Sequence, residues 1–194
     1  MENSLKQQFE NALWVSHMLF QRKMVTGSTG NISFRSNDRI YISRSGCCFG
    51  RLTCHDFSVL DVQGNHVEGP AASKEWPLHL AVYQASPDTH AVIHTHSRYS
   101  VLWSCLEHSD ETDCIPDYTP YLRMKLGKIG LIPFAAPGSE QLFQAFRERI
   151  CLSDGWILKQ HGAVIPGKDI LNAFYAAEEL EESAHIAWEL KHIF

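Results

Sequence analysis

The sequence has no long apolar run, no cluster of basic residues and no regular cysteine pattern. A membrane-spanning helix needs roughly 20 consecutive apolar residues, so we expect no membrane partner. The 17 lysines and arginines are scattered and the formal net charge is −5, which provides no basic stripe for a nucleic-acid backbone. These absences leave a small molecule, or further copies of the chain, as the expected partners.

The six cysteines form no CxxC pair, and the opening MENSLKQQFENALW does not resemble a secretory signal peptide. Disulfides are rare in the cytoplasm, so we expect reduced thiols and a cytoplasmic location. At 194 residues and 44% hydrophobic, the chain is long enough for one sizeable core. We therefore expect a single domain spanning residues 1–194.

Helical and strand patterns alternate along the chain and predict an α/β fold. Ser4 to Gln7 resembles a capping box, and Ser73 is the expected N-cap of a second helix, with Pro77 in its first turn. The predicted helices cover about 4–23, 73–87, 97–106, 139–150 and 170–188. The predicted strands cover 31–34, 39–43, 57–61, 90–96 and 128–134, and residues 155–165 are expected to form one or two further strands. This order predicts a layered domain with a central, mainly antiparallel sheet flanked by helices.

Two histidines stand two residues apart at the end of the apolar run AVIHTH. A strand turns alternate side chains to one face, so His94 and His96 would project together, close enough to bind one metal ion. His161 in LKQHGAV is a third candidate, also at the end of an apolar strand. Three imidazoles with an open fourth position are typical of catalytic zinc. The pair alone also fits ordinary strand histidines, and His161 alone fits a structural residue.

A glycine-rich loop, TGSTGNIS, follows the first predicted helix. Its small residues, among them Ser28 and Gly30, could turn several backbone N–H groups inward around a phosphate, or could form an ordinary turn. The segments ISRSG and AASKE favour the anion site, because they add the hydroxyls of Ser45 and Ser73 and the cation of Lys74.

Lys74 and Glu75 stand at the expected start of the second helix. A glutamate there normally just favours the helix dipole, but beside a metal it becomes a candidate acid or base. A lysine opposes the dipole, so Lys74 suggests a bound phosphate or carboxylate nearby. The alternative is a solvent-exposed lysine without a partner.

The ordered motifs TGSTGNIS, SRSG, SKE, HTH and QHG resemble the class II aldolase/adducin family over almost the whole chain. The resemblance implies a zinc enzyme, commonly a homotetramer with active sites between subunits; Co²⁺ or Mn²⁺ would also suit the ligands. It implies that His94, His96 and His161 bind the metal, together with Glu75, which also serves as acid or base. With Ser28 of the glycine loop, the implied phosphate-binding residues are Gly30, Asn31, Ser45, Gly46, Ser73 and Lys74.

Lys74 departs from the serine of the fuculose-phosphate aldolases. SKE, SGCCFG and TPYLRMKLGKIGLIPFAAPG are similar to one branch of the family, the 3-oxo-tetronate 4-phosphate decarboxylases. This implies a zinc-dependent lyase that forms dihydroxyacetone phosphate and CO2, and Tyr121 matches the tyrosine that neighbouring subunits supply to catalysis in the aldolases. Two alternatives stay open: an aldolase or 4-epimerase acting on a ketose phosphate such as fuculose 1-phosphate, and a non-enzymatic adducin-like interaction module, which would be expected to lack the metal ligands.

Overall fold

The computed structural model describes residues 2–193, and within them eight strands form one sheet. The strand order is β4-β3-β2-β1-β5-β8-β7-β6, and neighbouring strands are antiparallel except for β6 and β7. The strands are β1 (Asn31–Ser36), β2 (Arg39–Ser43), β3 (Phe57–Asp61), β4 (His66–Glu68), β5 (Ala91–Thr95), β6 (Ile129–Ile132), β7 (Gly155–Leu158) and β8 (Gly162–Gly167). The predicted α/β fold with a mainly antiparallel sheet is confirmed.

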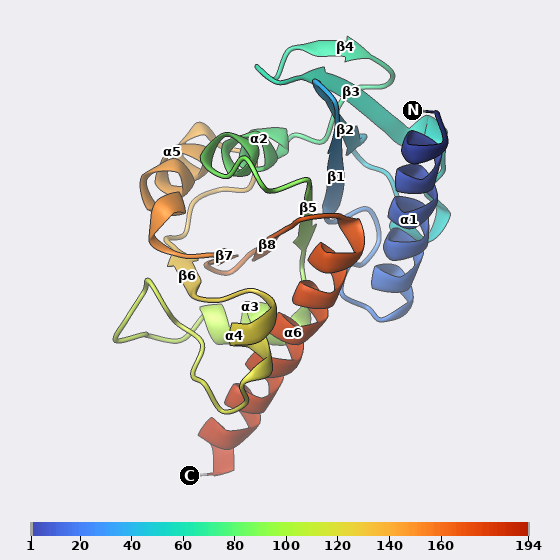
Figure 1. Ribbon diagram of the computed structural model, residues 1–194. Helices are drawn as coiled ribbons and strands as arrows, with labels where there is room; N and C mark the ends of the chain where they lie inside the picture. Colours follow the sequence, from blue (N-terminus) through green and yellow to red (C-terminus); the bar gives the residue numbers. More distant parts are fainter. Residues whose placement is uncertain (1, 194) are drawn as a thin grey trace.

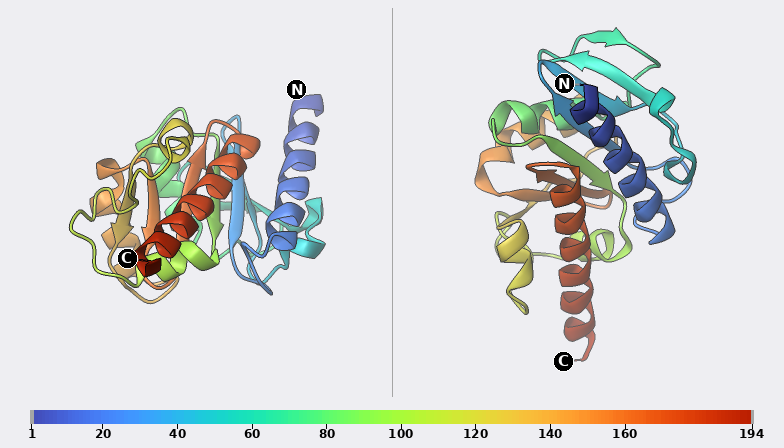
Figure 2. Two further views of the ribbon diagram at one scale, coloured as in Figure 1. Left: turned by 90° about the horizontal axis from the view of Figure 1, so that it is seen from below. Right: turned by 45° about the vertical axis from the view of Figure 1, so that its right-hand side comes forward.

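Helices cover both faces of this sheet. They are α1 (Glu2–Gln21), α2 (Trp76–Ala85), α3 (Arg98–Ser104), α4 (Tyr121–Lys125), α5 (Glu140–Arg149) and α6 (Ile170–Ile193), with short 3₁₀ turns at Phe49–Arg51, Cys54–Asp56 and Ile150–Leu152. Helices α2 and α5 pack on one face, and α1 and α6 pack on the other (Figures 1 and 2). The C-terminal part of α6 extends beyond the sheet (Figure 1), and α3 and α4 pack against this helix. Among residues 2–193, none of the helices combines the length and the apolar character that crossing a membrane requires.

Alternate residues of the central strand β5 face opposite cores. Ile93 packs in the core beneath α1 and α6, whereas Val92 packs in the core beneath α2 and α5, and both are fully buried. Because side chains alternate along a strand, His94 faces the same side as Val92. The sheet therefore directs this histidine into the layer where α2 begins.

Two helix starts differ from the prediction. Helix α1 already includes residues 2 and 3, so Ser4 lies inside the helix and the predicted capping box is wrong. The N-cap of α2 is Glu75 rather than Ser73, because residues 73–76 form a separate turn in which the N–H of Trp76 donates to the carbonyl of Ser73 (3.1 Å) before the helix begins. Pro77 lies in the first turn of α2, as expected. Lys74 consequently precedes the helix instead of opposing its dipole from the first turn.

Candidate metal centre and anion cavity

Four side chains from three distant segments meet at one end of the sheet. They are Glu75 at the start of α2, His94 in β5, His96 just after β5, and His161 in the turn before β8. Their potential ligand atoms all lie within 4.8 Å of one another. The four residues predicted to bind metal are thus brought together, while their role as ligands stays a prediction.

The hairpin between β7 and β8 positions His161. The strands close at the Leu158 and Gly162 pair, so His161 lies in the turn and not, as predicted, at the end of a strand. Gln160 makes this turn possible with a φ of +59°. A Cβ on Gly162 would clash with the carbonyl oxygen of Thr95 and lie 3.0 Å from His96 Cδ2. The glycine therefore permits the close approach that brings the histidines together.

The ring orientation of His94 is set by the sheet. Its Nδ1 lies 2.9 Å from the carbonyl oxygen of Ala163, which can only accept, so Nδ1 carries the proton. Its Nε2 then faces His96 Nε2 at 3.0 Å and Glu75 Oε2 at 3.1 Å. A proton or a metal ion can bind at that nitrogen, and metal binding would displace the proton.

The donor atoms fit a divalent cation. His161 Nε2 lies 3.2 Å from Glu75 Oε1, yet neither atom, nor His161 Nδ1, has a hydrogen-bond partner among residues 2–193. Buried polar atoms are rarely left in this condition. Around a tetrahedral zinc ion with ligands at about 2.0–2.1 Å, neighbouring donor atoms would be about 3.3 Å apart. Three separations, of 3.0, 3.1 and 3.2 Å, are close to that value, and the whole set of ligand atoms spans up to 4.8 Å.

The protonation states also suit metal binding. Burial, together with the neighbouring His94, lowers the pKa of His96 to about 3 and that of His161 to about 4. Burial alone would raise the pKa of Glu75, but contacts with His94, His161 and Asn31 outweigh it and lower this pKa to about 2. At neutral pH the cluster therefore presents neutral imidazoles at His96 and His161 and an ionised carboxylate, the forms that ligate metals.

A cavity of about 240 Å³ opens beside this cluster. It is lined by Glu75, His96 and His161, so the cavity and the cluster are continuous. It is also lined by all seven residues predicted to bind phosphate, namely Ser28, Gly30, Asn31, Ser45, Gly46, Ser73 and Lys74. The residues that the sequence reasoning missed are Thr29, Arg44, Pro137 and Gly138. Arg44 could have been found from its place beside Ser45 in ISRSG.

Gly30 allows the glycine loop to approach the cluster. Its φ is +77°, and a Cβ there would lie 2.6 Å from a methyl group of Val25 and 2.8 Å from the carbonyl oxygen of His94. No other residue fits both the backbone conformation and the space. The loop TGSTGNIS is therefore held directly against the strand that carries His94.

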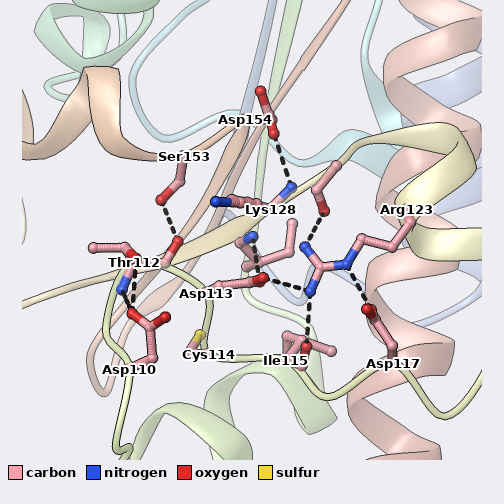
Figure 3. Close-up of polar contacts among 12 residues, drawn as sticks. Asp110, Thr112, Asp113, Cys114, Ile115, Asp117, Arg123, Lys128, Ser153 and Asp154 are labelled. Carbon is pink, nitrogen blue, oxygen red and sulfur yellow. Dashed lines mark hydrogen bonds and ion pairs between the residues drawn. The ribbon is translucent and has the colours of Figure 1, made fainter.

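Tyr121 is not brought into the cavity of its own chain. It is the first residue of α4 and is 57% exposed. Arg123 on the same helix pairs with Asp113 and Asp117, both at 2.5 Å, and donates to the carbonyl of Ile115 (Figure 3). These contacts tie α4 to the segment before it, so Tyr121 is presented on the outer surface by an anchored helix.

Comparison with known proteins agrees with this fold and cluster. Residues 10–188 match the family described as "Class II Aldolase and Adducin N-terminal domain". A Haemophilus influenzae protein named 3-oxo-tetronate 4-phosphate decarboxylase is 36% identical over 185 residues, 95% of this chain and 88% of its own. A Methanococcus maripaludis protein named L-fuculose phosphate aldolase is 34% identical over 183 residues, 94% and 97% of the two chains. The crystal structure of YgbL from Klebsiella pneumoniae superposes with a TM-score of 0.91 at 33% identity, covering 95% and 90%.

The fold and the glutamate–histidine cluster define an enzyme of the class II aldolase type, a class of metal-dependent lyases. The chain belongs to the class II aldolase and adducin family. The predicted resemblance is confirmed.

Proposed function

We propose that the protein is a carboxy-lyase that converts a 3-oxo-tetronate 4-phosphate into dihydroxyacetone phosphate and CO2, with Zn²⁺ as its metal. The observation that carries this proposal is Lys74. It lines the cavity that leads to the cluster, it is exposed, and it has no acidic partner among residues 2–193. A substrate with a carboxylate as well as a phosphate provides two anions for such a cavity.

The metal would be held by His94, His96 and His161, with Glu75 as a further ligand in the absence of substrate. It would supply Lewis-acid stabilisation of the negative charge that develops on the substrate as its carbon–carbon bond breaks. Loss of CO2 leaves an electron pair on C2, and a proton must replace the carboxylate there. Glu75 is the one carboxylate among residues 2–193 that lines the cavity. It is therefore the group that we assign to deliver this proton.

The wall of the cavity that is made by loops suits the phosphate. Backbone N–H groups of the TGSTGNIS loop and the hydroxyls of Ser45 and Ser73 can donate to phosphate oxygens. Lys74 stands at the same wall and can pair with the phosphate or with the departing carboxylate.

The proposal extends to a cytoplasmic homotetramer in which Tyr121 of one subunit completes the site of a neighbour. Its support is the exposed position of Tyr121 on an anchored helix, together with Met124 on the same helix, which is 76% exposed. The free state of all six cysteines is consistent with the cytoplasm.

The direct test is to assay the zinc-loaded protein with 3-oxo-tetronate 4-phosphates and, separately, with L-fuculose 1-phosphate. We expect stoichiometric CO2 and dihydroxyacetone phosphate from the first substrate class. Cleavage of fuculose 1-phosphate without any CO2 release would move the assignment to aldolase. An adducin-like module would do neither, and it is disfavoured because all four potential metal ligands are present and converge.

A further inference from the structure

A chain of buried polar side chains leads from Glu75 away from the cavity. The amide Nδ2 of Asn31 donates to Glu75 Oε2 (3.2 Å), and Asn31 Oδ1 is hydrogen-bonded to His79 Nε2. The other ring nitrogen of His79 lies 2.7 Å from the hydroxyl of Ser33, which lies 2.7 Å from the hydroxyl of Tyr83. These four residues are between 0% and 5% exposed. The glutamate is therefore connected to a fully enclosed network.

The network follows from the periodicity of two elements. His79 and Tyr83 come four and eight residues after Glu75, which places all three on one face of α2. Asn31 and Ser33 are two residues apart in β1, so their side chains point to the same face of the sheet. The helix face and the strand face are opposed, and their polar side chains pair in sequence.

The hydrogen bonds of this buried network all have the same donor-to-acceptor direction. Asn31 turns its N–H to the Glu75 carboxylate, so its oxygen must accept from His79 Nε2–H. Burial, followed by the nearby His94, lowers the pKa of His79 to about 3, so the ring is neutral and its Nδ1 accepts. Ser33 then donates to Nδ1 and accepts from Tyr83, whose pKa is raised by burial. Every donor in the chain points toward Glu75.

We propose that His79 is a positioning residue for Glu75, acting through the amide of Asn31. With His79 in place, Asn31 can present only its N–H to Glu75 Oε2, which fixes that oxygen. The other oxygen, Oε1, has no hydrogen-bond partner within residues 2–193 and stays available for the metal or for the transferred proton. The inference rests on the proposed role of Glu75.

Without His79, the amide of Asn31 is free to turn over. Its oxygen would then face a carboxylate oxygen, and two acceptors in contact repel each other. Glu75 would lose its fixed orientation although no residue of the cluster itself had changed. Loss of a hydrogen-bonding partner behind a metal ligand typically lowers activity or metal affinity by about 10–100-fold.

Two variants of matched polarity test this role. In His79→Gln the amide nitrogen can take the position of Nε2 and keep the bond to Asn31, whereas in His79→Asn the shorter amide reaches only the position of Nδ1, toward Ser33. We expect kcat of His79→Asn to fall about 10–100-fold with little change in KM, and kcat of His79→Gln to stay within about 5-fold of wild type. Equal kcat values in two folded variants would overturn the proposal.

A second readout needs no substrate. Co²⁺ suits the same ligands, so its visible absorption reports the ligand set in wild type, Glu75→Gln and both His79 variants. We expect the spectrum of His79→Asn to move toward that of Glu75→Gln, and the spectrum of His79→Gln to match wild type. Identical spectra for the two His79 variants would contradict the inference, even if the wild-type protein released no CO2 and the proposed function had failed.

If His79→Asn does not fold, a further variant, Asn31→Asp, still tests the proposal. Asn31→Asp keeps the shape of the side chain but places an acceptor against Glu75 Oε2, so it should move the cobalt spectrum toward that of Glu75→Gln. A role of Asn31 confined to phosphate binding would leave the spectrum unchanged, and that result would overturn the proposal.

Discussion

The two walls of the cavity differ in secondary structure and in exposure to solvent. The wall with the cluster comes from a central strand, a hairpin turn and a helix start, and Glu75, His94 and His161 are at most 9% exposed. The other wall, the loop wall, comes from loops, and Ser28, Gly46 and Lys74 in it are exposed. Electrostatic interactions are stronger where water is excluded. Substitutions in the cluster wall should therefore act on the chemical step, and those in the loop wall should act mainly on substrate binding.

We expect the largest effect of any substitution in the cluster wall from His94→Ala. We expect loss of the bound metal and at least about 1000-fold lower activity in a folded protein, because the imidazole is a proposed metal ligand and is not part of the hydrophobic core. Metal content, CO2 release and circular dichroism measure these effects. His90→Ala, an exposed histidine at the other end of the same segment, is the control and should retain metal. Full activity of metal-replete His94→Ala would remove this residue from the site.

Glu75→Gln should lower kcat about 100–1000-fold with little change in KM, because the amide keeps the shape but cannot transfer a proton. Steady-state kinetics on the decarboxylation reaction provide both constants. The control is Glu107→Gln, whose side chain is 96% exposed. A wild-type kcat would exclude Glu75 from the mechanism.

Tyr121→Phe tests whether a residue of a neighbouring subunit contributes to the site in addition to the two walls of the cavity. We expect about 100-fold lower kcat, from loss of an acid group. Co-expression of Tyr121→Phe with Glu75→Gln should restore part of the activity, because some mixed assemblies combine an intact cluster with a neighbour's intact tyrosine. Tyr118→Phe, also exposed (54%), should behave as wild type. No recovery in mixtures that are shown to be hetero-oligomers would refute the shared site.

Lys74→Ser tests which substrate anion the loop wall binds through Lys74. Kcat/KM for decarboxylation should fall about 10-fold, the scale of one charge-assisted hydrogen bond, with a smaller effect on any residual aldol cleavage. Only the decarboxylase substrate has a carboxylate to be positioned. Lys168→Ser controls for loss of a surface charge. Equal losses on both phosphorylated substrates would instead assign Lys74 to the phosphate, and no loss would leave it a surface residue.

The smallest effect concerns the anchor of the loop wall, where Arg44 Nε donates to Asp56 (2.7 Å). The hydrogen bond from Arg44 lowers the pKa of Asp56 below its unfolded value of about 3.9. The pair therefore stabilises the fold above that pH and loses this effect as the pH falls through the folded-state pKa. Asp56→Asn should lower Tm by about 1–3 °C at pH 7. The difference from wild type should shrink below about pH 4; a constant difference down to pH 3 would exclude the ion pair as its cause.

Local patterns predicted the cluster wall well. The strand period places His94 and His96 at the same end of β5, and the order of helices and strands matches the fold. The start of α2 was misplaced because residues 73–76 form a separate turn before the helix, which the helical pattern of the sequence does not distinguish from a first helical turn. His161 was placed on a strand because nothing local shows that Gln160 adopts a positive φ.

The polar network that connects Glu75 to Asn31 and His79 depends on the packing of α2 against β1. This packing cannot be predicted from either segment alone. The local signals that could have shown the network are the four-residue spacing of Glu75 and His79 along a helical pattern and the two-residue spacing of Asn31 and Ser33 along a strand. Asn31 was predicted to bind phosphate, which stays a prediction; its side chain contacts Glu75 and His79, and these contacts were not predicted. Arg44 was missed although it stands next to Ser45 in ISRSG, and both residues line the cavity.

The most direct test of the metal centre is X-ray absorption spectroscopy of the zinc-loaded protein. The account predicts only nitrogen and oxygen neighbours at about 2.0–2.2 Å, with the outer-shell scattering of three imidazole rings. The chain also has six free cysteines that could bind zinc. A sulfur shell at about 2.3 Å, or scattering from fewer than two imidazoles, would contradict the central claim that Glu75, His94, His96 and His161 hold the metal.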